Sequence, residues 1–198
     1  VTDKAPPERL AVETHAHFGG MDILVTNAGG PPAGLFESLT DDTWMQAVDL
    51  SLMSHVRMIR AALPYLKKSA DAAVLTITSY SVKQPIPNLV LSNSIRAATA
   101  GLTKTLALEL GPQGIRFNSI LPGWTQTERV TELMEYRARA GGTTIEDEIA
   151  VQLKESPLGR IAEPEEFGKA AAFFVSPAAS YITGALLSID GGMVKGTF

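Results

Sequence analysis

Residues 20–29 read Gly-Met-Asp-Ile-Leu-Val-Thr-Asn-Ala-Gly. The apolar run at 23–26 is short, rich in aliphatic residues and bounded by turn-forming residues, which is typical of a buried strand. Three more runs share this character, at 73–77, 116–120 and 186–189. Because long helical patterns separate the four runs, the sequence predicts an α/β protein in which helices cover both faces of a parallel sheet.

The segments between the strands carry helix signals. Thr40 precedes a long run of helical periodicity with Pro64 near its end, and this predicts one long helix. A second long helix is predicted at 92–110, where Gly111 stops it. The last helix is expected to open at Pro164, in the first turn, where the missing N–H of proline costs little.

A longer polar and helical segment, 127–155, follows the third strand, and Gly141-Gly142 interrupts it. An insertion beyond the carboxyl end of a strand is where α/β proteins commonly carry a substrate lid. We therefore expect residues 127–155 to form the lid of a ligand site. The chain has no internal repeat or linker, and its 198 residues fit one domain, 1–198, better than two.

Composition narrows the range of functions. The net charge is -4 and the basic residues are scattered, so neither a nucleic-acid partner nor a membrane partner is expected. No apolar stretch approaches the roughly 20 residues that span a bilayer, and no secretory signal is recognisable, so we expect a cytoplasmic protein.

The absence of cysteine excludes disulfides, thiolate metal sites and thiol catalysis. None of His15, His17 and His55 has metal-ligand spacing, so no metal site is expected.

Several short blocks follow one another in a characteristic order. They include residues 20–29, Leu75-Thr76-Ile77-Thr78-Ser79, Leu121-Pro122-Gly123 and Asp190-Gly191-Gly192. In this order and spacing the sequence resembles the short-chain dehydrogenase/reductase family, and within it the 3-oxoacyl-[acyl-carrier-protein] reductases. The resemblance implies a doubly wound parallel sheet of the Rossmann type in three α/β/α layers. It also implies an oxidoreductase that transfers hydride between NAD or NADP and an alcohol or carbonyl substrate.

The family fold includes a portion that these residues do not contain. Family members begin with a βαβαβ portion whose first turn carries a glycine-rich, phosphate-binding loop. No such pattern occurs in the sequence, and the run 29–34 is interpreted as a turn, because it follows the wrong strand. We therefore expect part of a longer protein, or a truncated one stabilised by a partner, with the strand at 23–26 as an exposed edge. The choice between NAD and NADP stays open, since it depends on that portion.

The resemblance also assigns four candidate catalytic positions. The family uses a tyrosine, a lysine four residues later, a serine about thirteen residues before the tyrosine, and an upstream asparagine. Ser79 matches the serine, whereas Ser92, Arg96 and Ser51 stand at the positions of tyrosine, lysine and asparagine. A serine hydroxyl is a far weaker acid than a phenol, and a guanidinium stays protonated, so the usual proton transfer is not available to these residues.

Two alternatives follow from these replacements. One is an active oxidoreductase with a divergent proton donor, for which Tyr80 and His55 are the nearest candidates, although packing roles suit both better. The other is a non-catalytic relative that binds a nucleotide or a protein partner through the same scaffold. Turnover of NADH or NADPH with a carbonyl substrate distinguishes the two.

The expected cofactor-binding residues lie at strand ends and after the third strand. Ala28 and its neighbours end the first strand at the carboxyl edge of the sheet, where small residues let the backbone approach a nucleotide. The segment 122–127 resembles the one that holds the nicotinamide carboxamide in the family, and Arg96 can reach ribose hydroxyls. The candidate set is Asn27, Ala28, Gly29, Arg96, Pro122, Gly123, Thr125 and Thr127.

The resemblance further implies self-association. Family members pair two long helices across a dimer axis. The apolar faces at 44–63 and 92–110 suit such pairing, although they equally suit packing on their own sheet. We expect a homodimer or a homotetramer.

Overall fold

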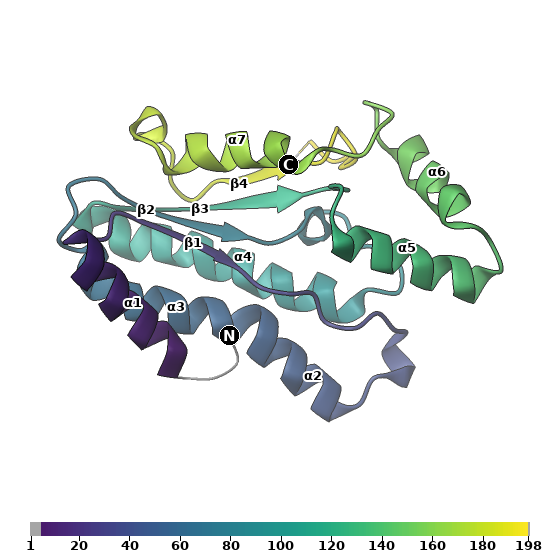
Figure 1. Ribbon diagram of the computed structural model, residues 1–198, viewed down its shortest axis with the longest axis horizontal. Coiled ribbons are helices and arrows are strands. Elements are labelled where there is room, and N and C mark those ends of the chain that lie inside the picture. Colours follow the sequence, from purple (N-terminus) through teal and green to yellow (C-terminus); the bar gives the residue numbers. More distant parts are fainter. Residues whose placement is uncertain (1–4, 198) are drawn as a thin grey trace.

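A four-stranded parallel sheet forms the centre of the protein (Figure 1). The computed structural model describes residues 5–197. The strands are β1 (Ile23–Asn27), β2 (Ala72–Ile77), β3 (Ile115–Pro122) and β4 (Leu186–Ile189), side by side in the order β1-β2-β3-β4. The four predicted strands are therefore confirmed, each within two residues of its expected bounds.

Helices cover both faces of this sheet, which confirms the predicted three layers. On one face lie α1 (Ala5–Phe18), α3 (Ser54–Leu66) and α4 (Val90–Leu110), and on the other lies α7 (Pro164–Val175) (Figure 1). Pro164 occupies the first turn of α7 as expected. Within residues 5–197, no helix combines the length and the apolar character needed to cross a membrane.

The core is divided between the two faces of the sheet. Val74 and Phe117 belong to a cluster with residues of α3 and α4, such as Leu66. Their strand neighbours point the opposite way, and Leu75 joins a second cluster with Phe174 of α7. This alternation is the two-residue period of a strand. Because both faces are covered, β2 and β3 are buried along almost their whole length.

The long helix predicted between β1 and β2 is divided by a wider turn. It consists of α2 (Asp41–Val48), a π-helical turn η2 (Asp49–Met53), and then α3. The carbonyl oxygen of Ser51 accepts a hydrogen bond from Thr99 Oγ1 of α4 at 2.8 Å. A neighbouring side chain that binds this carbonyl competes with the helix's own hydrogen bonds, which accounts for the wider turn. The prediction of one uninterrupted α-helix is therefore corrected.

Two helices follow β3, namely α5 (Glu128–Gly141) and α6 (Ile145–Glu155), and they extend beyond the carboxyl ends of the strands (Figure 1). The chain breaks between them at Gly142, whose φ of 66° is a left-handed conformation that favours glycine. Thr144 starts α6 with a capping box, in which its hydroxyl accepts from the backbone N–H of Asp147 at 3.1 Å. The predicted interruption is confirmed.

Among the described residues, β1 pairs with β2 alone and lies at the edge of the sheet. Leu24 is buried, whereas Ile23 and Val25 on the opposite face are 47% and 46% exposed. Apolar side chains on an edge strand favour pairing with a further strand. The exposed edge expected from the sequence is therefore present.

Arg116 of β3 ties the sheet to the C-terminal end of α7. Its buried guanidinium donates to the carbonyl oxygens of Phe174 at 2.9 Å, Ser176 at 3.2 Å and Ala179 at 3.2 Å. It also lies 3.6 Å from the carboxylate of Asp71. The last carbonyls of a helix have no partners within the helix, so a cation placed there both satisfies them and complements the helix dipole.

We expect Arg116→Met to lower the free energy of unfolding by about 3 kcal/mol, because the substitution leaves buried carbonyl groups without donors. Urea unfolding followed by circular dichroism measures this loss. The control is Arg9→Met, at an exposed arginine of α1, which should change the free energy by less than about 0.5 kcal/mol. Equal losses in the two variants would contradict the role given to Arg116.

Candidate functional site

A cleft of about 620 Å³ opens at the carboxyl ends of β1, β2 and β3. Ligands of parallel α/β proteins bind at this edge of the sheet. The walls of the cleft come from the strand ends, from α4 and from the start of α5. The structure brings most of the candidate residues together in this lining: Asn27, Ala28, Gly29, Ser79, Ser92, Arg96, Pro122, Gly123, Thr125 and Thr127.

Arg96 of α4 is the polar centre of the cleft. It is only 9% exposed. Its guanidinium donates to the carbonyl oxygens of Thr78 at 2.9 Å, Ala28 at 3.4 Å and Gly29 at 3.5 Å. Its Nε donates to Ser92 Oγ at 3.2 Å. One side chain therefore joins the end of β1 to the end of β2.

The charge of Arg96 persists in spite of its burial. Burial, with a smaller contribution from the positive charge of Arg129, lowers the pKa of Arg96 from 12.5 to about 10. A group with this pKa is still a cation at neutral pH. It therefore places a fixed positive charge beside the Ser92 hydroxyl, where it favours negative charge on a ligand atom.

Ser79 and Ser92 contribute two hydroxyl groups to the cleft. Ser79 follows β2, and its oxygen accepts from the backbone N–H of Ser81 at 3.1 Å. The oxygen of Ser92, in the first turn of α4, accepts from Arg96. Both oxygens act as acceptors in these contacts, so each O–H group can donate to a ligand.

Ser51 lies apart from the other candidates. It is buried in the π-helical turn and does not line the cleft. Its hydroxyl donates to the carbonyl oxygen of Gly29 at 3.3 Å. This hydrogen bond connects the π-helical turn to the loop after β1, and the catalytic role expected for Ser51 stays a prediction.

His55 lies in the core and not in the cleft lining. It is 2% exposed, and its Nδ1 is 2.7 Å from Thr26 Oγ1. Burial, assisted by the charge of Arg96, lowers the pKa of His55 from 6.5 to about 4. The imidazole is therefore neutral at pH 7 and packs in the core, so it is not positioned as a proton donor.

The buried His55 should make stability depend on pH between 6.5 and about 4. In this window the unfolded chain binds a proton at His55 and the folded chain does not, so the free energy of unfolding falls as the pH falls. The total loss should be about 3 kcal/mol, complete near pH 4. Urea unfolding across this range measures it in the wild type and in His55→Gln, which does not titrate. An equally steep decline in the variant would assign the effect to other groups.

The segment after β3 approaches β4 closely. A Cβ atom at Gly123 would lie 2.6 Å from the Cα atom of Asp190, so only glycine fits without a shift.

Thr125 lines the cleft, and its buried Oγ1 has no hydrogen-bond partner among the described residues. Thr127 Oγ1 donates to the carbonyl oxygen of Thr125 at 3.3 Å, which orders the turn into α5. A buried hydroxyl without a partner, at the wall of a cleft, is suited to bind a ligand.

Sequence reasoning missed Arg129, which also lines the cleft. Its Nη2 donates to the carbonyl oxygen of Pro31 at 3.3 Å, so it connects the start of α5 to the loop after β1. The guanidinium lies 3.2 Å from the point where a Cβ atom of Gly30 would stand. The position of Arg129 two residues after Thr127, in the first turn of the predicted lid, is the signal that could have found it.

Tyr80 lines the cleft next to Ser79, with its ring 6.2 Å from that of Trp124 in an edge-to-face arrangement. Burial, followed by the charge of Glu155, raises the pKa of Tyr80 to about 12. A phenol with this pKa stays protonated at neutral pH. Tyr80 can therefore donate a hydrogen bond, but it is not suited to shuttle through a phenolate.

The fold and the cleft together define a class: a parallel α/β protein with a ligand cleft at the carboxyl edge of its sheet and a fixed cation at the centre of that cleft. In residues 5–197, no three His, Asp or Glu side chains are grouped so as to hold a metal ion.

Comparisons with known proteins place the chain in one family. Residues 1–194 match the family described as Enoyl-(Acyl carrier protein) reductase. The chain is 33% identical to the 3-oxoacyl-[acyl-carrier-protein] reductase of Salmonella typhimurium over 195 residues, which cover 98% of this chain and 75% of that protein. It is also 33% identical to dehydrogenase/reductase SDR family member 4 of Oryctolagus cuniculus over 186 residues, 93% of this chain and 68% of that protein. The chain therefore belongs to the short-chain dehydrogenase/reductase family.

A solved structure of another relative is similar to almost the whole chain. The NADPH-bound short-chain oxidoreductase of Pseudomonas aeruginosa PAO1, described as containing an atypical catalytic center, matches with a TM-score of 0.87 and 29% identity. The match covers 99% of this chain and 74% of that one. The predicted family and the Rossmann-type fold are confirmed, and with them membership in a family of oxidoreductases.

Proposed function

We propose that the protein is an NAD(P)-dependent oxidoreductase that transfers hydride between its cofactor and an alcohol or carbonyl substrate. The observation that carries this proposal is the presence of the Ser79 and Ser92 hydroxyl groups, together with the fixed charge of Arg96, in the cleft of about 620 Å³ at the strand ends. A protein that only binds a nucleotide needs such a cleft. It does not need the hydroxyl groups of Ser79 and Ser92 beside the fixed charge of Arg96, so these groups favour the catalytic alternative.

The cleft fits a nicotinamide cofactor. The partnerless hydroxyl of Thr125 and the backbone of residues 122–127 would hold the carboxamide, and Asn27 and Arg96 would contact ribose. Arg129 adds a cation at the cleft wall, which favours an anionic ligand. When bound, the cofactor supplies or accepts the hydride. The NADPH found in the Pseudomonas aeruginosa relative supports this assignment.

The groups of this chain would stabilise the charge that develops on the substrate oxygen. We assign hydrogen bonds to that oxygen to the hydroxyls of Ser79 and Ser92, and electrostatic stabilisation to Arg96, whose Nε lies 3.2 Å from Ser92 Oγ. A serine hydroxyl does not ionise near neutral pH, so Ser92 is not the source of the proton. We assign that role to solvent water, which gives a proton to the Ser92 hydroxyl as this hydroxyl passes its own proton to the substrate oxygen.

We further propose that residues 127–155, which form α5 and α6, act as the substrate lid. The segment begins at the cleft wall and extends beyond the sheet. Arg129 holds its first turn to the loop after β1 through the carbonyl oxygen of Pro31. Leu133 and Met134 of α5 also belong to an apolar cluster with Tyr80 and Ile86, so opening of the lid would have to separate these side chains as well as break the hydrogen bond.

We also propose that the protein associates as a homodimer or homotetramer. Met45 of α2 and Leu108 of α4 are 66% and 72% exposed. Both side chains lie in the helical segments 44–63 and 92–110, which the sequence predicts to pair across a dimer axis. Sedimentation velocity of the intact protein tests the proposal, and a single monomer species at micromolar concentration would overturn it.

Turnover of the reduced cofactor tests the main proposal. The full-length protein is mixed with NADH or NADPH and a panel of aldehydes and ketones, and the absorbance of the reduced cofactor is followed. We expect saturable oxidation of the cofactor with at least one substrate. Saturable cofactor binding without turnover on any of them would support the non-catalytic alternative and overturn the proposal.

Ser92→Ala should lower kcat by about 100-fold, because the substitution removes one hydrogen bond to the developing oxyanion. The matched control is Ser94→Ala, at an exposed serine in the same turns of α4, which should leave kcat unchanged. Steady-state kinetics of the two variants compares them directly. Equal rates in Ser92→Ala and Ser94→Ala would remove Ser92 from the reaction.

A further inference from the structure

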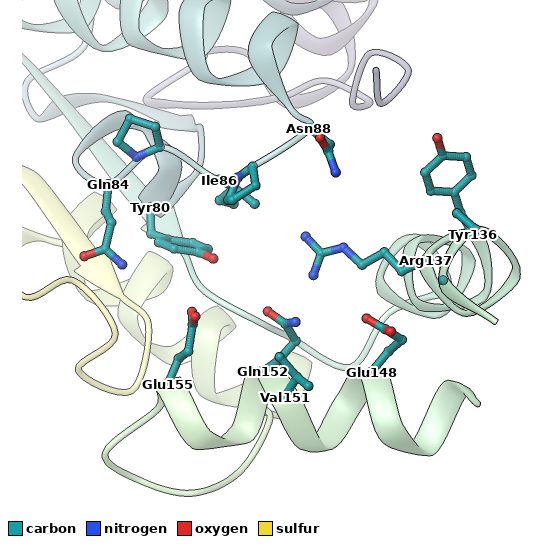
Figure 2. Close-up of a pocket in the computed structure, with 14 residues that line it drawn as sticks. Tyr80, Gln84, Ile86, Asn88, Tyr136, Arg137, Glu148, Val151, Gln152 and Glu155 are labelled. Atoms are coloured by element: carbon teal, nitrogen blue, oxygen red, sulfur yellow. The ribbon is translucent and has the colours of Figure 1, made fainter. Parts of the chain in front are cut away.

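A second cavity, of about 550 Å³, lies beneath the helices of the proposed lid (Figure 2). Its walls come from the loop 80–88, the C-terminal half of α5 and one face of α6. It shares Tyr80 and Ile86 with the cleft at the strand ends. The two cavities are therefore neighbours, and a ligand whose reacting group lies in the cleft can extend into the second cavity.

Polar side chains point into this cavity from two helices (Figure 2). The guanidinium of Arg137 enters from α5. Glu148, Gln152 and Glu155 enter from α6, where their spacing of four and three residues places them on one helix face. The tip of the Tyr80 ring faces the same space from the opposite wall. Donors and acceptors thus surround the cavity on several sides.

These groups are largely uncommitted to the protein itself. Arg137 forms neither an ion pair nor a hydrogen bond with any residue in 5–197, and its recorded contact is with the ring of Trp124, 5.4 Å from the guanidinium carbon. The side chains of Gln152 and Glu155 likewise have no hydrogen bond within the described residues. Glu148 accepts one hydrogen bond, from Thr143 Oγ1 at 2.7 Å. Polar groups in this state are available to a ligand.

The charges around the cavity have both signs, so an ion of either sign would lie near a like charge. Arg137 carries one positive charge, which repels a cationic ligand. Glu148 and Glu155 carry two negative charges, which repel an anionic one. A neutral ligand with several hydroxyl groups avoids both penalties, because each hydroxyl can donate to a carboxylate and accept from a guanidinium. The apolar parts of the wall, including Ile86 and Val151, suit the C–H faces of such a ligand.

We infer that this cavity is a substrate subsite that binds the polyhydroxylated, sugar-like part of a substrate whose carbonyl or alcohol carbon reacts in the cleft. The reaction in this inference rests on the proposed oxidoreductase function. The class of ligand is inferred independently, from Arg137, Gln152 and the two glutamates. It predicts that a polyol binds even though it contains no carbonyl group.

Binding of sorbitol to the full-length protein tests this subsite without requiring turnover. Saturation-transfer NMR, with and without NADPH, should give a saturable signal for the wild type. We expect Arg137→Leu and the nearly isosteric Gln152→Leu to weaken binding at least tenfold. The control is Arg139→Leu on the same helix, because Arg139 is exposed, pairs with Glu135 and lies outside the cavity lining. This control should bind sorbitol as the wild type does.

Kinetics then connects the subsite to the reaction. For a ketohexose, KM should rise at least tenfold in Gln152→Leu, while KM for cyclohexanone, a ketone without hydroxyl groups, should not change. Fluorescence titration with NADPH in each variant should show unaltered cofactor affinity. Melting curves show whether Arg137→Leu is folded. If it is not, the comparison of Gln152→Leu with the wild type decides the result.

Three results would overturn the subsite: absence of sorbitol binding to the wild type, binding that is equal in the wild type and both cavity variants, or tighter binding of an anionic sugar acid than of sorbitol. A failure of the proposed function has a different signature. In that case NADPH does not bind or no carbonyl compound is reduced, while the sorbitol signal without cofactor still decides the subsite.

Discussion

Replacing Arg96 by methionine should abolish measurable turnover and lower the free energy of unfolding by about 4 kcal/mol. The guanidinium satisfies the carbonyl groups of Thr78, Ala28 and Gly29, which belong to two different strand ends, and the first two of these hydrogen bonds are buried. The same group fixes the Ser92 hydroxyl and supplies the positive charge of the cleft. Urea unfolding measures the first loss, and cofactor oxidation measures the second.

Arg96→Lys separates the two contributions. Lysine keeps a positive charge, but its single nitrogen cannot reach the ends of β1 and β2 at once. We therefore expect a smaller loss of stability, about 2 kcal/mol, together with residual turnover. If Arg96→Met is as stable as the wild type and turns over at the same rate, Arg96 is neither the link between the strands nor the charge that the reaction uses.

Gly123→Ala should lower the free energy of unfolding by about 3 kcal/mol. The added Cβ would stand 2.6 Å from the Cα atom of Asp190, and this contact is with backbone, which cannot rotate away. The segment 122–127 must then move away from β4, so affinity for NADPH should fall at least tenfold. Urea unfolding and fluorescence titration with NADPH measure the two effects.

Gly101→Ala is the matched control for that substitution. Gly101 lies inside α4, and no atom would lie within 4 Å of an added Cβ. Alanine favours a helix more than glycine does, so this variant should be more stable than the wild type by up to about 1 kcal/mol. A similar loss in both variants would show that the close approach to Asp190 does not restrict position 123.

Local signals in the sequence were sufficient for most of the fold. Thr40 caps α2 through the backbone N–H of Thr43, as its side chain predicts, and Gly142 ends α5 in the left-handed conformation. The π-helical turn could not be predicted in this way. It depends on a hydrogen bond between Ser51 and Thr99, which lie on different helices and 48 residues apart.

The candidate site was predictable where it depends on strand ends. The carboxyl ends of parallel strands share one edge, so Asn27, Ser79 and Gly123 were expected to meet, and they line one cleft. The hydrogen bond between Ser51 and Gly29 was not predictable, because the two residues are 22 positions apart in the sequence and no local pattern specifies their contact. The roles proposed for these residues remain predictions.

The second cavity has no sequence signal of its own. Its lining depends on the angle at which α5 and α6 meet the loop 80–88, which no local pattern specifies. The spacing of Glu148, Gln152 and Glu155 shows that they share a helix face, but the same spacing is usual on a solvated face. Only the packing of the two helices shows that this face borders a cavity.

Transfer of deuterium from the cofactor to a ketone reports directly on the chemistry assigned to the cleft. The full-length protein is incubated with a ketone and with NADPH or NADH that carries deuterium at both positions on C4 of the nicotinamide, and the alcohol product is analysed by mass spectrometry. We predict one deuterium atom on the carbinol carbon of the product, and a marked reduction of labelled product in Ser92→Ala. Saturable binding of both cofactors with no deuterium in any product would contradict hydride transfer in this cleft.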